Sequence, residues 1–115
     1  MTKKDELRID QQQLTNAWQR TLPEWIEESD KCEVLADESD PHALRITIQN
    51  AGRQAYSLDF KVQYVDSREV KVQLIDVEKD QVSVDERTEV IQQLIQDYTR
   101  HLHECAQALH QLTHA

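Results

Sequence analysis

The sequence predicts an α+β fold: an N-terminal helix, an antiparallel β-meander of three to four strands, and a long C-terminal amphipathic helix packed on one sheet face, as a two-layer sandwich. Two patterns predict this fold. Apolar residues recur every three or four positions near both ends of the chain, and at every second position between them. A length of 115 residues supports one modest core, so we expect residues 1–115 to form a single α+β domain.

The N-terminal helix is expected to begin after Asp10. Asp10 and Gln13 have the spacing of a helix-capping pair. The apolar residues that follow fall on one helical face: Leu14, Ala17, Trp18 and Leu22. Pro23 has no backbone N–H for a continuing helix, so it ends this element and begins a second short piece that runs to Glu28.

The middle of the chain alternates between apolar and polar residues, as strands with one buried face do. The clear stretches are 44–48, 56–64 and 70–74, and a weaker one covers 32–36. Asn50-Ala51-Gly52 supplies the residue types of a short hairpin loop whose last residue needs a positive φ. At Ile75-Asp76-Val77 the alternation inverts, which predicts either a β-bulge or a bend away from the core. The sheet should therefore have one apolar and one polar face.

The last helix is predicted to run from about Asp85 to about His114, after a capping box formed by Ser83 and Glu86. Its apolar stripe steps by four and three: Ile91, Ile95, Tyr98, Leu102, Cys105, Leu109 and Leu112. Such a helix is about 43 Å long at ~1.5 Å per residue, whereas strands of eight or nine residues reach about 28 Å at ~3.3 Å per residue. The helix should therefore extend past the sheet from Cys105 onwards.

This overhang predicts self-association. It carries Leu109 and Leu112, and contact with water would be unfavourable for both side chains. The N-terminal helix can cover only part of it. Small or neutral residues such as Ala108 flank the stripe and allow another element to approach closely. We expect a homodimer that packs through Cys105, Ala108, Leu109 and Leu112.

Charge limits the choice of partner. The formal net charge of −9 at pH 7 argues against nucleic acid and against an anionic membrane surface, because both bind basic faces. Eight acidic residues lie between Glu24 and Asp40 against a single lysine. They favour a basic protein as partner, while the alternative is a solvated helix end and turn. A calcium loop is not expected there, because the stretch has no glycine.

Four of the five histidines lie in the last 15 residues, which raises the question of a metal site. His110 and His114 are four residues apart, so a helix can place both imidazoles on one ion. His103 precedes His110 by a helical rise of roughly 10 Å, which is too far to share that ion. A structural zinc site needs four ligands and a catalytic one three. We therefore expect no metal and no other cofactor. The candidate ligands are His110 and His114; His101 and Cys105 form a second pair, but Cys105 belongs to the apolar stripe and is expected in the core.

Catalytic motifs are not found in the sequence. Its serines lack the glycine-flanked elbow of hydrolases, and the single glycine leaves no glycine-rich loop to bind a phosphate. Asp59 and Asp76 are carboxylates within predicted strands, but sequence does not show their separation. We predict no catalytic residues and do not expect an enzyme.

The first ten residues are polar and no apolar run follows them, so we expect neither a signal peptide nor a membrane span. Cys32 and Cys105 have no metal-ligand spacing and should be reduced in the cytoplasm. We therefore expect a non-catalytic cytoplasmic interaction module, homodimeric and adaptor- or chaperone-like, that recognises a protein through its polar sheet face or its acidic N-terminal third. The alternative is a small-ligand or metal-binding protein, or an enzyme, with a site between helix and sheet. Burial of Asp76 would favour that alternative.

Overall fold

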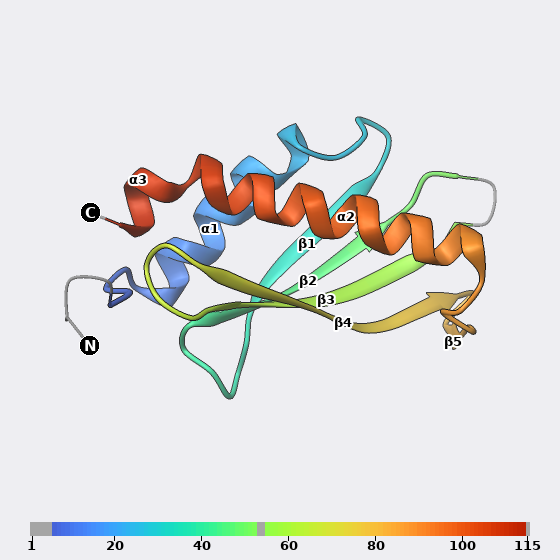
Figure 1. The fold of residues 1–115 in the computed structure, drawn as a ribbon, viewed down its shortest axis with the longest axis horizontal. Helices are drawn as coiled ribbons and strands as arrows, with labels where there is room; N and C mark the ends of the chain where they lie inside the picture. Colours follow the sequence, from blue (N-terminus) through green and yellow to red (C-terminus); the bar gives the residue numbers. More distant parts are fainter. Residues whose placement is uncertain (1–5, 53–54, 115) are drawn as a thin grey trace.

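The computed structural model describes residues 6–52 and 55–114 and confirms the predicted fold class. Within these residues one antiparallel sheet has the strand order β1-β2-β3-β4-β5, and the helices leave its other face open (Figure 1). The strands are β1 (Lys31–Ala36), β2 (Ala43–Gln49), β3 (Ser57–Tyr64), β4 (Val70–Lys79) and β5 (Val82–Ser83). The helices are α1 (Gln11–Thr21), the 3-10 turn η2 (Leu22–Glu24), α2 (Glu89–Ala108) and α3 (His110–Thr113).

Helix α1 forms as the sequence predicts. The Asp10 carboxylate accepts hydrogen bonds from the backbone N–H groups of Gln12 and Gln13, so Asp10 is the N-cap. Pro23 lies in η2 directly after the helix, which confirms the predicted break. Trp18 is fully buried and its indole N–H donates to the Tyr64 hydroxyl at 3.1 Å, which ties α1 to β3.

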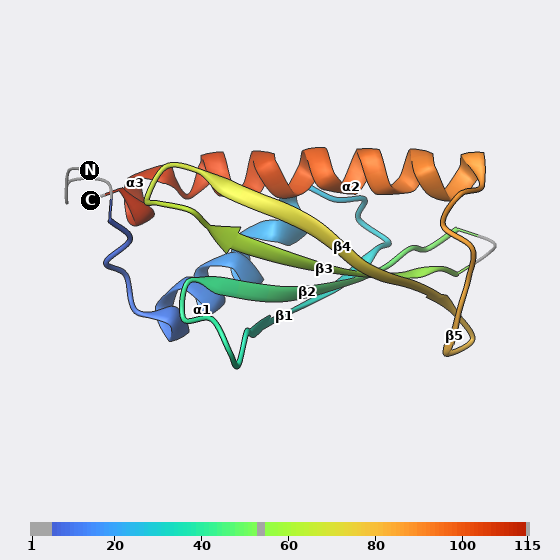
Figure 2. The same cartoon turned by 60° about the horizontal axis from the view of Figure 1, so that its bottom comes forward.

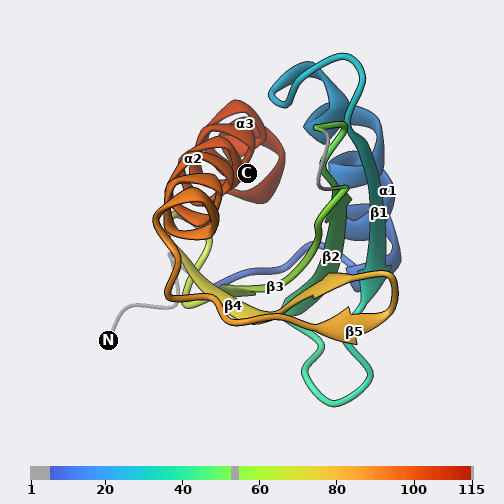
Figure 3. The same cartoon turned by 90° about the vertical axis from the view of Figure 1, so that its right-hand side faces the viewer.

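One face of the sheet supplies most of the core. Apolar partners cross the sheet in register, as in the row Val34, Ile46, Phe60 and Leu74. α1 packs against β1, and α2 lies along β4 (Figure 3). The two helices are also in contact with each other. The layer between helices and sheet is closed by large side chains without exposed surface, such as Trp18, Phe60 and Leu102.

The inverted alternation in β4 is a β-bulge. Asp59 pairs with Asp76 and Phe60 pairs with Leu74, so Ile75 is the extra residue on β4. The bulge returns Val77 to the core, where it is fully buried. β4 then turns through Asp80 and Gln81, both with positive φ, into the two-residue strand β5. Paired positive φ angles match the right-handed twist of the hairpin.

The predicted start and end of the last helix are wrong. Thr88, not Ser83, is the N-cap of α2, and its hydroxyl accepts from the Ile91 N–H. Ser83 belongs to β5 and donates to the Asp76 carboxylate at 2.7 Å, so it is not available as a cap. α2 ends at Ala108, and Leu109 separates it from the one-turn helix α3.

The prediction of a positive φ at Gly52 is also wrong. Among the described residues of the loop between β2 and β3, the positive φ is at Ala55, and a backbone hydrogen bond from the Asn50 N–H to the Tyr56 carbonyl joins the two ends of the loop. Gly52 allows a close side-chain contact: its N–H donates to Asn50 Oδ1 at 2.9 Å, and a Cβ at this position would lie 2.7 Å from that oxygen, so the Asn50 amide would have to shift.

Candidate functional site

The face of the sheet opposite the helices is uncovered (Figure 2). We use the name open sheet face for the outward-facing side chains of β1 to β4. Its charged members are balanced, with Lys31, Arg45, Lys61 and Lys71 against Glu33, Asp59, Asp76 and Glu78. An electrically balanced face therefore lies on a chain whose net charge is −9.

The charges of the open sheet face are arranged in rows across the strands. An acidic row contains Glu33, Asp59 and Asp76, with Thr47 between the first two. In the adjacent row Arg45 lies beside Lys61. Two apolar side chains are also exposed on this surface, Leu35 (54%) and Ile75 (40%).

A groove of about 510 Å³ lies on the open sheet face beside the loop that joins β1 to β2. Its walls come from β1, β2, β3 and this loop: Leu35, Ala36, Asp37, Glu38, Ser39, Arg45, Ile46, Thr47, Asp59 and Phe60. Arg45 is exposed, and within the described ranges its guanidinium group has no hydrogen-bond or ion-pair partner. The groove therefore offers an uncommitted cation beside acidic side chains.

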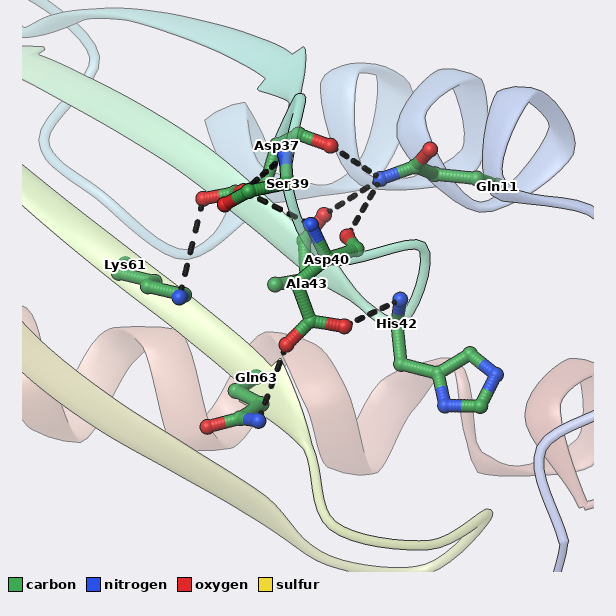
Figure 4. Close-up of polar contacts among 8 residues, drawn as sticks. All are labelled: Gln11, Asp37, Ser39, Asp40, His42, Ala43, Lys61 and Gln63. Atoms are coloured by element: carbon green, nitrogen blue, oxygen red, sulfur yellow. Dashed lines mark hydrogen bonds and ion pairs between the residues drawn. The ribbon is translucent and has the colours of Figure 1, made fainter.

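Helix α1 holds the groove loop in place. The side-chain amide of Gln11 shares its N–H groups among the carbonyl oxygens of Asp37, Asp40 and Ala43, at 2.9 to 3.0 Å (Figure 4). The Asp40 carboxylate accepts from the Gln63 side chain at 3.0 Å, which ties the same loop to β3. These contacts preorganise one wall of the groove.

Asp37 is the buried charge at this corner, with 5% of its surface exposed. One carboxylate oxygen accepts from the Ser39 N–H, the Ser39 hydroxyl and the Asp40 N–H, and the other lies 3.9 Å from Lys61 Nζ (Figure 4). Burial by itself raises the pKa of Asp37, but the hydrogen bonds from Ser39, the charge of Lys61 and the hydrogen bond from Asp40 lower it below its ordinary value. The side chain is therefore a structural anion that orders the loop.

Asp59 and Asp76 are directly opposed on β3 and β4, so their chemistry as a carboxylate pair needs consideration. Asp59 accepts from the Thr47 hydroxyl at 2.7 Å, towards β2. Asp76 accepts from the Ser83 hydroxyl at 2.7 Å, towards β5, and from the Val77 N–H. The two carboxylates thus accept hydrogen bonds from separate donors on opposite sides. Asp76 is partly exposed, so the burial that would have favoured a ligand-binding protein is not found.

A second polar cluster joins α2 to two loops. The Tyr98 hydroxyl donates to the Asp30 carboxylate at 2.6 Å and accepts from the Asn50 side chain at 2.8 Å. The other oxygen of Asp30 accepts from the Ala51 N–H. Burial raises the pKa of Tyr98, and the hydrogen bond from Asn50 opposes this effect. The hydrogen bond to Asp30 and the charges of Asp30 and Glu27 raise the pKa further. This cluster holds a neutral phenol and closes one end of the fold.

The predicted interaction residues are spread between core and surface. Cys105 has no exposed surface and belongs to the core, so the expected overhang does not begin there. Leu109 is partly buried and packs on the same core. Ala108 is exposed, and 45% of Leu112 is exposed. The structure therefore leaves Ala108 and Leu112 as the accessible members of the set.

The two candidate metal ligands come together, and the ring of His114 is already engaged. The rings of His110 and His114 are stacked with centroids 5.1 Å apart. Both nitrogens of His114 have partners, Ser67 Oγ at 2.6 Å and Arg68 Nε at 3.3 Å. Within residues 6–52 and 55–114, no group of three or more His, Cys, Asp or Glu side chains is placed to hold a metal ion.

The two cysteines are free thiols in different environments. Burial, with smaller contributions from Cys32 and Glu24, raises the pKa of Cys105 to about 12. Burial also raises the pKa of the partly exposed Cys32, against a hydrogen bond from Gln19. A raised pKa disfavours the thiolate that nucleophilic attack and metal binding require.

The groove was missed at the level of sequence. An Asp followed two residues later by a Ser, as at Asp37 and Ser39, is typical of an Asx turn and could have indicated an ordered loop. The sequence analysis interpreted the same stretch by its acidic charge alone. The role of Gln11 has no local signal, because its three partners lie 26 to 32 residues away.

Among the described residues, none of the helices has the length and apolar character needed to cross a bilayer. Comparison of the chain with protein-family models, with curated proteins and with solved structures found no match.

Proposed function

We propose that this chain is a non-catalytic, cytoplasmic interaction module that forms a homodimer and binds a basic protein on its open sheet face. The observation that carries the proposal is the uncovered second face of the sheet, with its charge rows and a preorganised groove. Ordered charges on a rigid sheet provide register and orientation for a partner. The free thiols Cys32 and Cys105 support the cytoplasmic assignment.

The acidic row gives the partner its chemistry. Glu33 is exposed, and Asp59 and Asp76 are directed along the sheet by their hydrogen bonds. Lysine or arginine side chains of a partner can pair with this row, while the exposed Leu35 and Ile75 supply apolar contact beside it. The net charge of −9 also attracts a basic partner from a distance.

The contact between copies is proposed at the C-terminal end of the helices. Leu112 and Ala108 remain accessible there, while Leu109 belongs largely to the core. Substitution of Leu109 would therefore disturb folding as well as association. A substitution at Leu112 therefore tests association without removing a core side chain.

The dimer is tested by light scattering of Leu112→Asp. The matched control is Val90→Asp, because Val90 is also apolar and 61% exposed but lies at the opposite end of α2. We expect wild type and Val90→Asp to have twice the monomer mass and Leu112→Asp to have the monomer mass. A monomeric wild type, or a Leu112→Asp variant of unchanged mass, contradicts the dimer.

The partner surface is tested with a photo-crosslinking residue at Gln73 on the open sheet face, and separately at Gln96 on α2; both positions are exposed. We expect an adduct with a basic protein from position 73 only. In the Gln73 background, Glu33→Lys should abolish the adduct and Glu86→Lys should retain it, although both change the net charge equally. If both variants lost the adduct equally, binding would depend on overall net charge, and the proposal that the partner docks on the open sheet face would be contradicted.

A further inference from the structure

The outer edge of β4 is open along its first half. Among the described residues, β4 pairs with β3 on one side, and on the other side only Glu78 and Lys79 pair, with β5. β5 lies at the end of β4 that is close to the start of α2 (Figure 1). Residues 70–74 therefore have a neighbouring strand on one side alone. We use the name β4 edge for this stretch.

The backbone groups of Val70, Val72 and Leu74 face outward at the β4 edge. The hairpin between β3 and β4 is closed by a hydrogen bond from the Val65 N–H to the Glu69 carbonyl at 2.9 Å. Hydrogen-bonded and non-hydrogen-bonded pairs alternate along an antiparallel ladder. Counted from this hydrogen bond, the three outward residues belong to non-hydrogen-bonded pairs with β3. In the part of the chain that the structure describes, the hydrogen bonds outside the ladder include no acceptor for their N–H groups.

The apolar layer is also incomplete at the β4 edge. Val72 and Leu74 are only partly buried. The residues that they face on β3, Val62 and Phe60, have no exposed surface. One more strand beside β4 would therefore satisfy the outward backbone groups and cover these two side chains.

Other parts of the sheet edges are covered from within the chain. On β1, the Val34 N–H donates to the Gln19 side chain. On β4 beyond the bulge, the Val77 N–H donates to the Asp76 carboxylate, and the Val77 carbonyl accepts from the Val84 N–H. Strand edges without such cover are sites of pairing with other chains.

We propose that the β4 edges of two copies pair antiparallel about a two-fold axis at Val72. This inference rests on the homodimer proposed above and specifies its interface. Val72 then faces its counterpart, and Val70 faces Leu74 of the partner subunit. Lys71 faces Gln73 of the partner subunit on the open side of the sheet. Every outward N–H group of the β4 edge gains a carbonyl acceptor, and apolar side chains meet apolar ones.

Charge and the bulge select this axis. An axis at Lys71 would place the two copies of this lysine opposite each other, and like charges in that position destabilise a sheet. An axis at Gln73 would extend the pairing to Ile75, the extra residue of the bulge, where the ladder is interrupted. An axis at Val72 avoids both.

Leu112 belongs to the same end of the fold as the β4 edge. The Thr113 hydroxyl donates to the carbonyl of Ser67, in the turn that leads into β4, at 3.1 Å. Antiparallel pairing therefore brings α3 of each copy towards the middle of β4 in the other. Val90 is in the first turn of α2, at the end of the fold where β5 lies (Figure 1). The pairing also joins the open sheet faces of the two copies into one surface for a basic partner.

The axis is tested by light scattering of variants at two exposed positions of the β4 edge. Gln73→Lys places a lysine opposite Lys71 of the partner subunit in both halves of the interface. We expect the monomer mass, although this variant reduces the negative net charge. Lys71→Glu/Gln73→Lys keeps the new lysine and makes both pairs oppositely charged, so it should restore twice the monomer mass. Gln13→Lys is the matched control and should stay dimeric, because Gln13 is exposed on α1, which packs on β1 at the far side of the sheet.

Amide hydrogen exchange, measured by NMR on the full chain, gives a second readout. The amides of Val72 and Leu74 bond across the proposed interface. They should exchange at least about tenfold more slowly in wild type than in Leu112→Asp. The amides of Lys71 and Gln73 bond to β3 and should change much less.

The possible outcomes separate this inference from the homodimer itself. If wild type is dimeric but Gln73→Lys has the same mass, or the Val72 and Leu74 amides exchange as fast as in Leu112→Asp, pairing through the β4 edge is wrong and the homodimer stands. If Lys71→Glu/Gln73→Lys stays monomeric, the axis at Val72 is wrong. A monomeric wild type contradicts the homodimer, and the inference with it.

Discussion

Gln19 on α1 completes the outer edge of β1 at Val34. Its side-chain oxygen accepts from the Val34 N–H at 2.8 Å, and its nitrogen donates to the Cys32 carbonyl at 3.4 Å. The side-chain amide thus takes the place that a neighbouring strand would occupy. Edge strands with open hydrogen-bonding groups are sites of unwanted pairing, and this contact covers part of such an edge.

Gln19→Ala should therefore destabilise the fold by about 1–2 kcal/mol, because the Val34 N–H loses its partner. Urea unfolding followed by circular dichroism measures the change in the free energy of unfolding. Gln12→Ala is the control, since the Gln12 side chain donates to the exposed Asn16 side chain one helical turn away and has no contact with the sheet among the hydrogen bonds of the described residues. Equal midpoints for the two variants would show that the β1 edge does not depend on Gln19.

Asp37 should dominate the acid side of the stability profile. A carboxyl group with a lowered pKa in the folded state stabilises the fold above its unfolded pKa, and this contribution is lost as the pH falls through the folded value. We expect the free energy of unfolding to drop below about pH 4 in wild type and to change less in Asp37→Asn. Glu38→Gln, at the exposed neighbouring position, should follow wild type. Parallel profiles for all three proteins would contradict the role of Asp37.

The free energy of unfolding at alkaline pH should depend on the ionisation of tyrosine side chains. Burial raises the pKa of Tyr64 to about 12 and that of Tyr98 further, so the folded state keeps protons that an unfolded phenol releases near pH 10. The stability that these two tyrosines contribute is therefore fully present below about pH 10. It is lost as the pH rises towards their pKa values in the folded state. Absorbance of tyrosinate should show all three tyrosines ionising near pH 10 in denaturant, whereas Tyr64 and Tyr98 remain protonated in the native protein. Simultaneous ionisation of all three in the native protein would refute this account.

Tyr98→Phe should destabilise the fold by about 1–3 kcal/mol, because Asp30 and Asn50 both lose a partner. The control is Tyr56→Phe, because among the described residues the Tyr56 hydroxyl has no hydrogen-bond partner. Thermal unfolding of the two variants gives the comparison. A Tyr98→Phe melting temperature no lower than that of Tyr56→Phe would show that the cluster adds nothing to stability.

Thiol chemistry provides an independent check on burial. Cys105 has no exposed surface and Cys32 is partly exposed, so a thiol reagent should modify only Cys32 in the native protein and both cysteines in denaturant. Mass spectrometry after brief labelling identifies the modified residue. Rapid native labelling of Cys105 would mean that α2 opens readily.

The features that were predictable from sequence depend on neighbours close in the chain. The cap at Asp10, the break at Pro23 and the alternation of the strands use residues within a few positions of one another, and each is confirmed. The inversion at Ile75 also marked the bulge. The predicted start of α2 is wrong because the Ser83 hydroxyl donates a hydrogen bond to Asp76 on the neighbouring strand and does not cap the helix. The residues next to Ser83 in the sequence do not indicate this contact.

The candidate site was less predictable for the same reason. The polar face of the sheet followed from the alternation, but the groove depends on Gln11 reaching a loop more than 20 residues away. The placement of α3 likewise depends on the turn that contains Ser67, 46 residues before Thr113. Such contacts form only once the elements are assembled, so periodicity does not reveal them.

The hydroxyl of Tyr98 has a kinetic consequence. It meets Asp30 across 68 positions of the chain, whereas β2 and β3 are joined by a short loop and pair with nearby residues. Closing a long loop costs more chain entropy than closing a hairpin, so the meander can form first while α2 arrives last. During refolding, the β-hairpins should therefore form before α2 packs on the sheet. The hydrogen bond between the Tyr98 hydroxyl and Asp30 should form in the last step.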